Sequence, residues 1–159
     1  MVVASIFFAV IVLIDRLVKH YIYLNFMPGE MREFIPGFID LLYHQNTGMA
    51  FSLLDNHQWV LLVTTPLLLA VVAFAIIRGM VTCKVQRLAL VAIMAGGFSN
   101  WLSRLVYGFV VDMFSFSFVR FAVFNVADIF ITVGAVVFCL FYLLEEQKKK
   151  KAKEVAEDA

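Results

Sequence analysis

Residues 110–128 read VVDMFSFSFVRFAVFNVAD, and they place two carboxylates, Asp112 and Asp128, among side chains that are almost all apolar or aromatic. Between the two acids the only charged residue is Arg120. A carboxylate in apolar surroundings is costly unless partners compensate for its lost hydration. The sixteen positions from one acid to the other allow the chain to loop back. We therefore expect the two carboxylates to meet in one place.

Outside this segment the chain is too apolar for an ordinary soluble domain. Its 159 residues are 63% hydrophobic and 16% charged, whereas soluble domains contain about 45–50% apolar and about 25% charged residues. Apolar runs that approach the roughly 20 residues needed to cross a bilayer recur four times. We predict a mainly α-helical membrane protein, with a single domain over residues 1–159 and spans over residues 2–23, 59–77, 88–106 and 125–144.

The distribution of lysine and arginine predicts the orientation in the membrane, because loops rich in these residues stay in the cytoplasm. They gather between the second and third spans and in the tail, residues 145–159, as Arg78, Lys84, Arg87, Lys148, Lys149, Lys150, Lys151 and Lys153. We therefore place both termini in the cytoplasm, and residues 25–58 and 107–124 outside. The net charge of +1 gives no reason to expect a nucleic-acid partner. We expect the tail to interact with anionic membrane lipid.

Three further features are assigned no special role. Residues 1–14 have no basic residue before their apolar run and no small-x-small site after it, so we interpret them as part of the first span rather than as a removable leader. Cys83 and Cys139 have no His or second Cys at metal-ligand spacing, and we predict neither a metal nor a cofactor. His20, His44 and His57 are scattered, and no Ser–His or Cys–His set accompanies the two acids.

Two spans contain polar pairs at helical spacing. Asp15 and Lys19 lie four residues apart in the first span and share a face. They form either a structural ion pair near the membrane end, with the lysine extending to the interface, or part of a site, and the spacing leaves both open. Asn100 and Arg104 repeat the spacing in the third span, at the same depth. For Asn100 the alternative is an interhelical hydrogen bond without a catalytic role.

Residues 25–58 differ in character from the spans. Two Pro-Gly pairs, at residues 28–29 and 36–37, are turn signals around short strand-like runs. This pattern predicts a small β-rich insert on the outer face. Its end, NTGMAF at residues 46–51, combines the amide of Asn46 with the permissive Gly48. Such a segment suits a backbone that approaches a ligand or another helix, and a plain turn is the alternative.

Asp128 occupies the first turn of the fourth span, where the helix dipole alone favours an anion. That explanation does not account for Asp112, which lies on a different segment. Two carboxylates without a metal cluster or a nucleophile suggest the arrangement of aspartic proteases, in which two acids a few ångströms apart share one proton. The ionised acid takes a proton from an attacking water, and the protonated acid donates to the peptide carbonyl oxygen.

Five short motifs, in this order, resemble those of the lipoprotein signal peptidases (signal peptidase II), a family of bacterial inner-membrane aspartyl proteases. DRLVK at residues 15–19 is similar to the family's D-Q-x-T-K motif, NTGMAF at residues 46–51 to N-x-G-x-A-F, and NWLSR at residues 100–104 to the end of G-N-x-x-D-R. VDMF at residues 111–114 is similar to V-D-F, and FNVAD at residues 124–128 to F-N-x-A-D. The resemblance extends over nearly the whole chain.

The resemblance implies that Asp112 and Asp128 are a catalytic dyad that removes the signal peptide from diacylglyceryl-modified prolipoproteins, cutting just before the lipid-modified cysteine. It also implies an outer-face β-cradle in residues 25–58, a periplasmic helix in the loop of residues 107–124, and inhibition by lipopeptides. The active site is expected towards the outer face of the bacterial inner membrane. The residues expected to bind substrate or to brace the site are Asp15, Lys19, Asn46, Gly48, Asn100, Arg104, Asn125 and Ala127.

Four residues depart from the family's motifs: Arg16 replaces Gln, Val18 replaces Thr, Ser99 replaces Gly and Ser103 replaces Asp. We expect the change at position 103 to remove a partner of Arg104 or of a nearby main-chain group. A divergent relative that is weakened, or that only binds lipoprotein signal peptides, is the alternative function. A proton-coupled transporter is less well supported, because the second span has no ionisable lining and the chain has no internal repeat.

Overall fold

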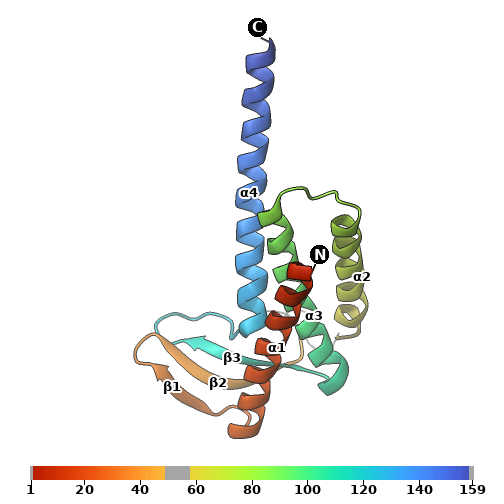
Figure 1. The fold of residues 1–159 in the computed structure, drawn as a ribbon. Coiled ribbons are helices and arrows are strands. Elements are labelled where there is room, and N and C mark those ends of the chain that lie inside the picture. Colours follow the sequence, from red (N-terminus) through yellow and green to blue (C-terminus); the bar gives the residue numbers. More distant parts are fainter. Residues whose placement is uncertain (1, 49–57, 158–159) are drawn as a thin grey trace.

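The computed structural model describes residues 2–48 and 58–157, drawn in Figure 1. Within these residues helices and strands follow in the order α1 (Val2–Asn25), β1 (Met31–Ile35), β2 (Ile39–Asn46), α2 (Gln58–Ile77), α3 (Lys84–Tyr107), β3 (Val110–Phe116) and α4 (Val126–Glu157). The strands lie together at one end of the helices, and the C-terminal part of α4 projects from the opposite end (Figure 1).

The predicted helices are present, with bounds that differ by a few residues except at the end of α4. That helix continues through the segment predicted as a tail and ends at Glu157. The segment has a composition that favours helix, because Lys, Glu, Gln and Ala dominate it. The long helix therefore carries the lysine cluster away from the other helices, as Figure 1 shows.

Three of the described helices are long and apolar enough to cross a membrane, and they cover Gln58–Ile77, Lys84–Tyr107 and Val126–Lys151. The remaining predicted span, residues 2–23, corresponds to α1, which has 24 residues but contains Asp15, Arg16 and Lys19. By composition alone α1 is therefore not among the helices that could cross a membrane. Asp15 and Lys19 are nevertheless buried inside the protein, so these two charges do not face the surroundings of the helix.

A three-stranded sheet with the order β1-β2-β3 confirms the predicted β-rich insert, and both strand pairs are antiparallel. The prediction of a helix within residues 107–124 is wrong. That segment contributes β3 instead, which pairs Asp112 with His44 and Val110 with Asn46 of β2. Its β-branched and aromatic composition, VVDMFSF, fits a strand that is buried at one end.

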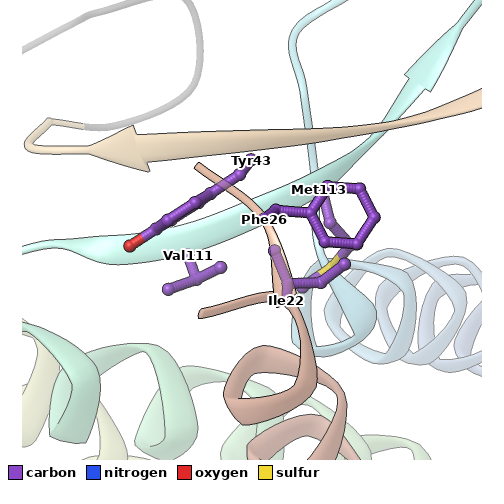
Figure 2. Packing of buried hydrophobic residues seen from close by; sticks show 5 residues of the cluster. All are labelled: Ile22, Phe26, Tyr43, Val111 and Met113. Atoms are coloured by element: carbon purple, nitrogen blue, oxygen red, sulfur yellow. The ribbon is translucent and has the colours of Figure 1, made fainter. Parts of the chain in front are cut away.

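Side chains of β3 alternate between two environments, as the period of two in a strand requires. Val111 and Met113 pack with Ile22, Phe26 and Tyr43 in a buried cluster, which Figure 2 shows in close-up. Each fully buried apolar side chain of this size contributes about 1.5–3 kcal/mol. The cluster therefore fixes the sheet on the end of α1. Val110, Asp112 and Phe116 of β3 line a cavity instead.

Helices α3 and α4 approach closely at glycines. A Cβ atom at Gly96 would lie 2.5 Å from the carbonyl oxygen of Ala127, and one at Gly134 would lie 2.8 Å from the carbonyl oxygen of Ala89. Small residues allow such backbone contact between membrane helices. The first turn of α4 therefore rests directly on the backbone of α3.

Candidate active site

Asp112 is held by two side-chain amides. Its Oδ2 accepts a hydrogen bond of 2.7 Å from Asn46 Nδ2, and its Oδ1 accepts one of 2.6 Å from Asn125 Nδ2. Asn46 comes from the end of β2, and Asn125 immediately precedes α4. The carboxyl group is almost completely buried, with 1% of the residue exposed. Three separate elements thus determine the position of this carboxylate.

Asp128 is part of the cap of α4. The backbone N–H of Asp128 donates to Asn125 Oδ1 and the backbone N–H of Asn125 donates to Asp128 Oδ2, each over 3.0 Å. This reciprocal arrangement is a capping box, which satisfies two backbone donors at a helix start. The other carboxylate oxygen, Oδ1, accepts a hydrogen bond of 2.8 Å from Asn100 Nδ2 on α3.

Asn125 connects the two acids. Its side chain donates to Asp112, and its backbone N–H donates to Asp128. Each of the four carboxylate oxygens consequently accepts one N–H. The two carboxylates lie together, as the sequence predicts, and their orientations are fixed by groups from β2, α3 and the start of α4.

Burial, and secondly the negative charge of Asp128, raise the pKa of Asp112 from 3.8 to about 6. Hydrogen bonds from Asn46 and Asn125, and the positive charge of Lys19, act in the opposite direction. Two carboxylates that are close together in a site of low polarity do not readily both ionise. The electrostatics therefore favour a pair that retains a proton to a higher pH than an isolated aspartate does.

Asp15 and Lys19 form a buried ion pair, with 2.6 Å between Lys19 Nζ and Asp15 Oδ2. Lys19 Nζ also donates to Asn100 Oδ1 over 2.6 Å. The Oδ1 of Asp15 accepts a hydrogen bond of 2.8 Å from the backbone N–H of Ala127. Asp15 and Lys19 were expected to form either a structural ion pair or part of a site. The two expectations are compatible, because the buried ion pair also contacts Asn100 and Ala127, beside Asp128.

Arg104 and Gly48 connect the end of the β-rich insert to α3. Arg104 Nη2 donates to the carbonyl oxygen of Gly48 over 2.6 Å, and the backbone N–H of Gly48 donates to Asn46 Oδ1 over 2.9 Å. Arg104 therefore also orients Asn46, which donates to Asp112. The remainder of the predicted motif, residues 49–51, lies outside the described residues.

Of the two partners considered for position 103, Arg104 or a nearby main-chain group, the structure shows Ser103 in contact with a main-chain group and not with Arg104. Ser103 lies on the α1 side of α3, where its hydroxyl accepts a hydrogen bond of 2.9 Å from Arg16 Nη1 and donates to the carbonyl oxygen of Ser99 over 3.1 Å. Adjacent residues of a helix point about 100° apart, so neighbours in the sequence can face different helices. The contacts of Arg104 described above do not involve Ser103.

A cavity of about 480 Å³ opens beside the two acids. Its polar wall contains both carboxylates together with Asn46, Asn100 and Arg104. The sequence did not indicate the apolar part of the wall, which comes from β3, from the segment before α4 and from the first turns of α4. That part is formed by Val110, Phe116, Phe121, Ala122, Val123, Phe124, Ile129, Ile131 and Val133.

The aromatic spacing within residues 114–124 was the available signal for this wall, because Phe114, Phe116, Phe121 and Phe124 pack against one another in the structure. Among residues 2–48 and 58–157, no three His, Cys, Asp or Glu side chains are grouped as metal ligands. Neither His20 nor His44 lines the cavity beside the two acids, and His57 lies outside the described residues.

Comparisons with known proteins found similar proteins over most of the chain. A family model described as Signal peptidase (SPase) II matches residues 7–144. The lipoprotein signal peptidase of Streptococcus pneumoniae (strain ATCC BAA-255 / R6) is 42% identical over 142 residues, covering 87% of this chain and 93% of its own length. That of Streptococcus pyogenes serotype M5 (strain Manfredo) is 39% identical over 133 residues, covering 82% and 88%.

Two solved structures share the fold. Both are described as bacterial membrane enzymes whose structures were obtained by the in meso method. One aligns with a TM-score of 0.87 at 24% identity, over 94% of this chain and 92% of its own. The other aligns with a TM-score of 0.83 at 23% identity, over 90% and 94%.

Proposed function

This chain belongs to the signal peptidase II family of proteases, and from that premise we propose that it removes signal peptides from prolipoproteins, with Asp112 and Asp128 as an aspartyl catalytic dyad. The observation that carries the proposal is the convergence of both carboxylates on Asn125 beside one cavity. A protease of this type needs two acids that differ in protonation and lie within reach of one peptide bond.

In the proposed reaction the ionised acid takes a proton from a water molecule as the water oxygen attacks the scissile carbonyl carbon. The protonated acid donates its proton to the carbonyl oxygen, which gives a tetrahedral intermediate. Collapse of that intermediate breaks the C–N bond, and the leaving nitrogen receives a proton from the dyad. The raised pKa of Asp112 supports this scheme, because it allows the pair to hold one proton to a higher pH than isolated aspartates do.

The surrounding amides support the scheme by fixing the acids before substrate binds. Positioning of this kind supplies a large part of the rate enhancement in enzymes. Arg104 lines the same cavity, and its buried Nε has no hydrogen-bond partner among the described residues. We assign it to binding of the substrate main chain near the scissile bond, together with Asn46.

The resemblance and the cavity together suggest a substrate with a lipid-modified cysteine. The cavity wall formed by Phe121, Phe124, Ile129 and Val133 is apolar, and such a wall favours acyl chains. We propose that the diacylglyceryl group lies near this wall and that the cut falls just before the modified cysteine. Lipopeptide inhibitors would compete for the same cavity.

We also propose that the chain is a single domain with α1 as a fourth span, in the bacterial inner membrane. The 24 residues of α1 correspond to roughly 36 Å, and Ile6, Val10, Leu13 and Leu17 give it an exposed apolar surface. The N-terminus of α1 and the C-terminus of α4 both lie away from the sheet in Figure 1, which supports termini on one side. Clustered lysines place that side in the cytoplasm and the two acids towards the outer face.

The substrate assignment is tested with purified protein in lipid nanodiscs, by mass spectrometry of released signal peptide. We expect cleavage of a diacylglyceryl-modified prolipoprotein and little or none of the same chain without the lipid. Binding of the modified chain without cleavage would instead support the non-catalytic alternative. The relatives named above do not favour that alternative, because both are named lipoprotein signal peptidases and are about 40% identical to this chain over most of its length.

A further inference from the structure

Three of the residues that depart from the family's motifs are connected to one another. Arg16 comes from α1, and Ser99 and Ser103 come from α3, one helical turn apart. They lie between the two helices, on the side of α3 that faces α1. The departures are therefore not independent surface changes.

Arg16 donates hydrogen bonds to two residues of α3. Its Nη1 donates to Ser103 Oγ over 2.9 Å, and its Nη2 donates to the Tyr107 hydroxyl over 3.2 Å. The guanidinium carbon also lies 5.3 Å from the centre of the Tyr107 ring. A planar guanidinium can make such paired contacts simultaneously, whereas neither lysine nor the shorter glutamine provides the same fork.

The two serines extend this contact to Asp15. Ser103 donates to the carbonyl oxygen of Ser99 over 3.1 Å, and the Ser99 hydroxyl donates to Asp15 Oδ2 over 2.6 Å. Ser99 and Asp15 are both fully buried. A buried carboxylate with satisfied acceptors has little freedom to rotate, so the serine hydroxyl restricts the orientation of Asp15.

Asp15 in turn holds the start of α4, because its Oδ1 accepts from the backbone N–H of Ala127, the residue before Asp128. A carboxylate in this position satisfies a free N–H of the first turn and complements the helix dipole. Lys19 provides a second connection, from Asp15 through Asn100 to the carboxylate of Asp128. A shift of Asp15 therefore shifts the Asp128 side of the site.

We propose that Arg16, Ser99 and Ser103 are positioning residues, which lock α1 against α3 and thereby fix Asp15 and the first turn of α4 that carries Asp128. None of the three lines the cavity beside the two acids, so they act through Asp15 rather than on the substrate. The inference rests on the proposed function, since it assigns these residues to the same reaction.

The test measures kcat and KM for cleavage of the lipid-modified prolipoprotein, together with the midpoint of thermal unfolding, for Ser99→Ala, Arg16→Gln and Ser103→Ala. Thr64→Val is the matched control, because Thr64 Oγ1 also donates to the carbonyl four residues earlier, on α2. A displacement of about 1 Å in a catalytic group can lower the rate about 10²-fold. We expect kcat to fall about tenfold or more in Ser99→Ala, with KM nearly unchanged.

The double variant Arg16→Gln, Ser103→Ala tests whether Arg16 and Ser103 affect kcat through one shared contact or independently. We expect its loss of kcat to be smaller than the product of the two single losses, whereas Arg16→Gln and Thr64→Val should combine as independent changes.

Tyr107→Phe removes one hydroxyl from a half-exposed ring, and it tests the Arg16 contact without a buried change. Its expected effect is a fall of about two- to tenfold in kcat.

Full kcat in Ser99→Ala and Tyr107→Phe, in a preparation whose wild-type protein cleaves the substrate, would overturn the positioning role. A fall in unfolding midpoint with unchanged kcat would overturn it as well, since that result indicates helix packing alone. Failure of the wild-type protein to cleave would be a different result, because it overturns the proposed function itself.

Discussion

At the scale of single residues, the central feature is a pair of carboxylates whose four oxygens each accept an N–H from a defined donor. The sequence indicates which residue types meet, because acids in an apolar segment require partners. It does not indicate which amide holds which oxygen. That information depends on the capping box at Asn125 and on the register that pairs β2 with β3.

The coupling between the two acids gives a testable pKa. The second cause of the raised Asp112 pKa is the charge of Asp128, so Asp128→Asn should lower the pKa of Asp112 from about 6. The value should stay above 3.8, because burial, the first cause, is unchanged. Infrared titration of the isotope-labelled carboxyl group measures the midpoint, and Glu33→Gln on β1 is the control. An unchanged midpoint in Asp128→Asn would show that the acids do not interact.

Asn125 is expected to matter for stability as well as for catalysis. Asn125→Ala removes the side-chain cap of α4, which typically costs about 1 kcal/mol, and it leaves the buried Asp112 without one donor. The control is Cys83→Ala, because Cys83 occupies the N-cap of α3 without a side-chain cap hydrogen bond. Denaturation in one detergent should show a clear loss for Asn125→Ala and almost none for Cys83→Ala. Equal losses would contradict the capping role.

At the scale of elements, the helices were predictable from apolar runs, whereas β3 and the contacts between helices were not. Residues 107–124 carry both strand and loop features, and the strand is decided by pairing with β2, which is distant in sequence. Similarly, Arg16 and Ser103 are 87 positions apart, and no periodicity indicates that they meet. The residues of the site and the helices that carry them could be selected from sequence, but the hydrogen bonds between those helices needed the structure.

The contact between α3 and α4 allows a matched comparison of two adjacent glycines. In Gly96→Ala the new Cβ would meet the backbone oxygen of Ala127 at 2.5 Å, so the first turn of α4 has to move. In Gly97→Ala it would meet only the flexible Leu69 side chain, at 3.3 Å. We expect Gly96→Ala to lower both stability and cleavage, by about 1–3 kcal/mol in unfolding free energy. Gly97→Ala should retain both, and the opposite order would contradict the packing described.

At the scale of the whole molecule, α4 is long enough to connect the two membrane boundaries. From Asp128 to Lys148 is 20 residues, or about 30 Å of helix, which equals the thickness of the hydrocarbon core. Lysines 148–151 then surround the helix, because successive residues are rotated by about 100°. We therefore propose that the lysines meet the phosphates of the cytoplasmic leaflet and that Asp128 lies at the outer boundary.

The depth of the exposed Cys139 tests this placement. Cys139 lies nine residues from Lys148 and eleven from Asp128, so a nitroxide attached to it in a Cys83→Ser background should lie near the bilayer centre. A label at Leu144→Cys, with Cys139 also replaced by serine, should lie closer to the headgroups. Power-saturation measurements with oxygen and a polar relaxation agent give both depths. A shallow label at Cys139 would contradict the proposed placement of α4.

The dyad itself is tested most directly by the cleavage rate of lipid-modified prolipoprotein with Asp112→Asn and Asp128→Asn, each compared with wild type and with Asp40→Asn. Asp40 lies on β2, where it accepts a hydrogen bond from Ser117, and it does not line the cavity beside the two acids. We predict that each dyad variant remains folded and loses at least about 10²–10⁴-fold in kcat, while Asp40→Asn retains the wild-type rate. Wild-type cleavage by either Asp112→Asn or Asp128→Asn would contradict the dyad.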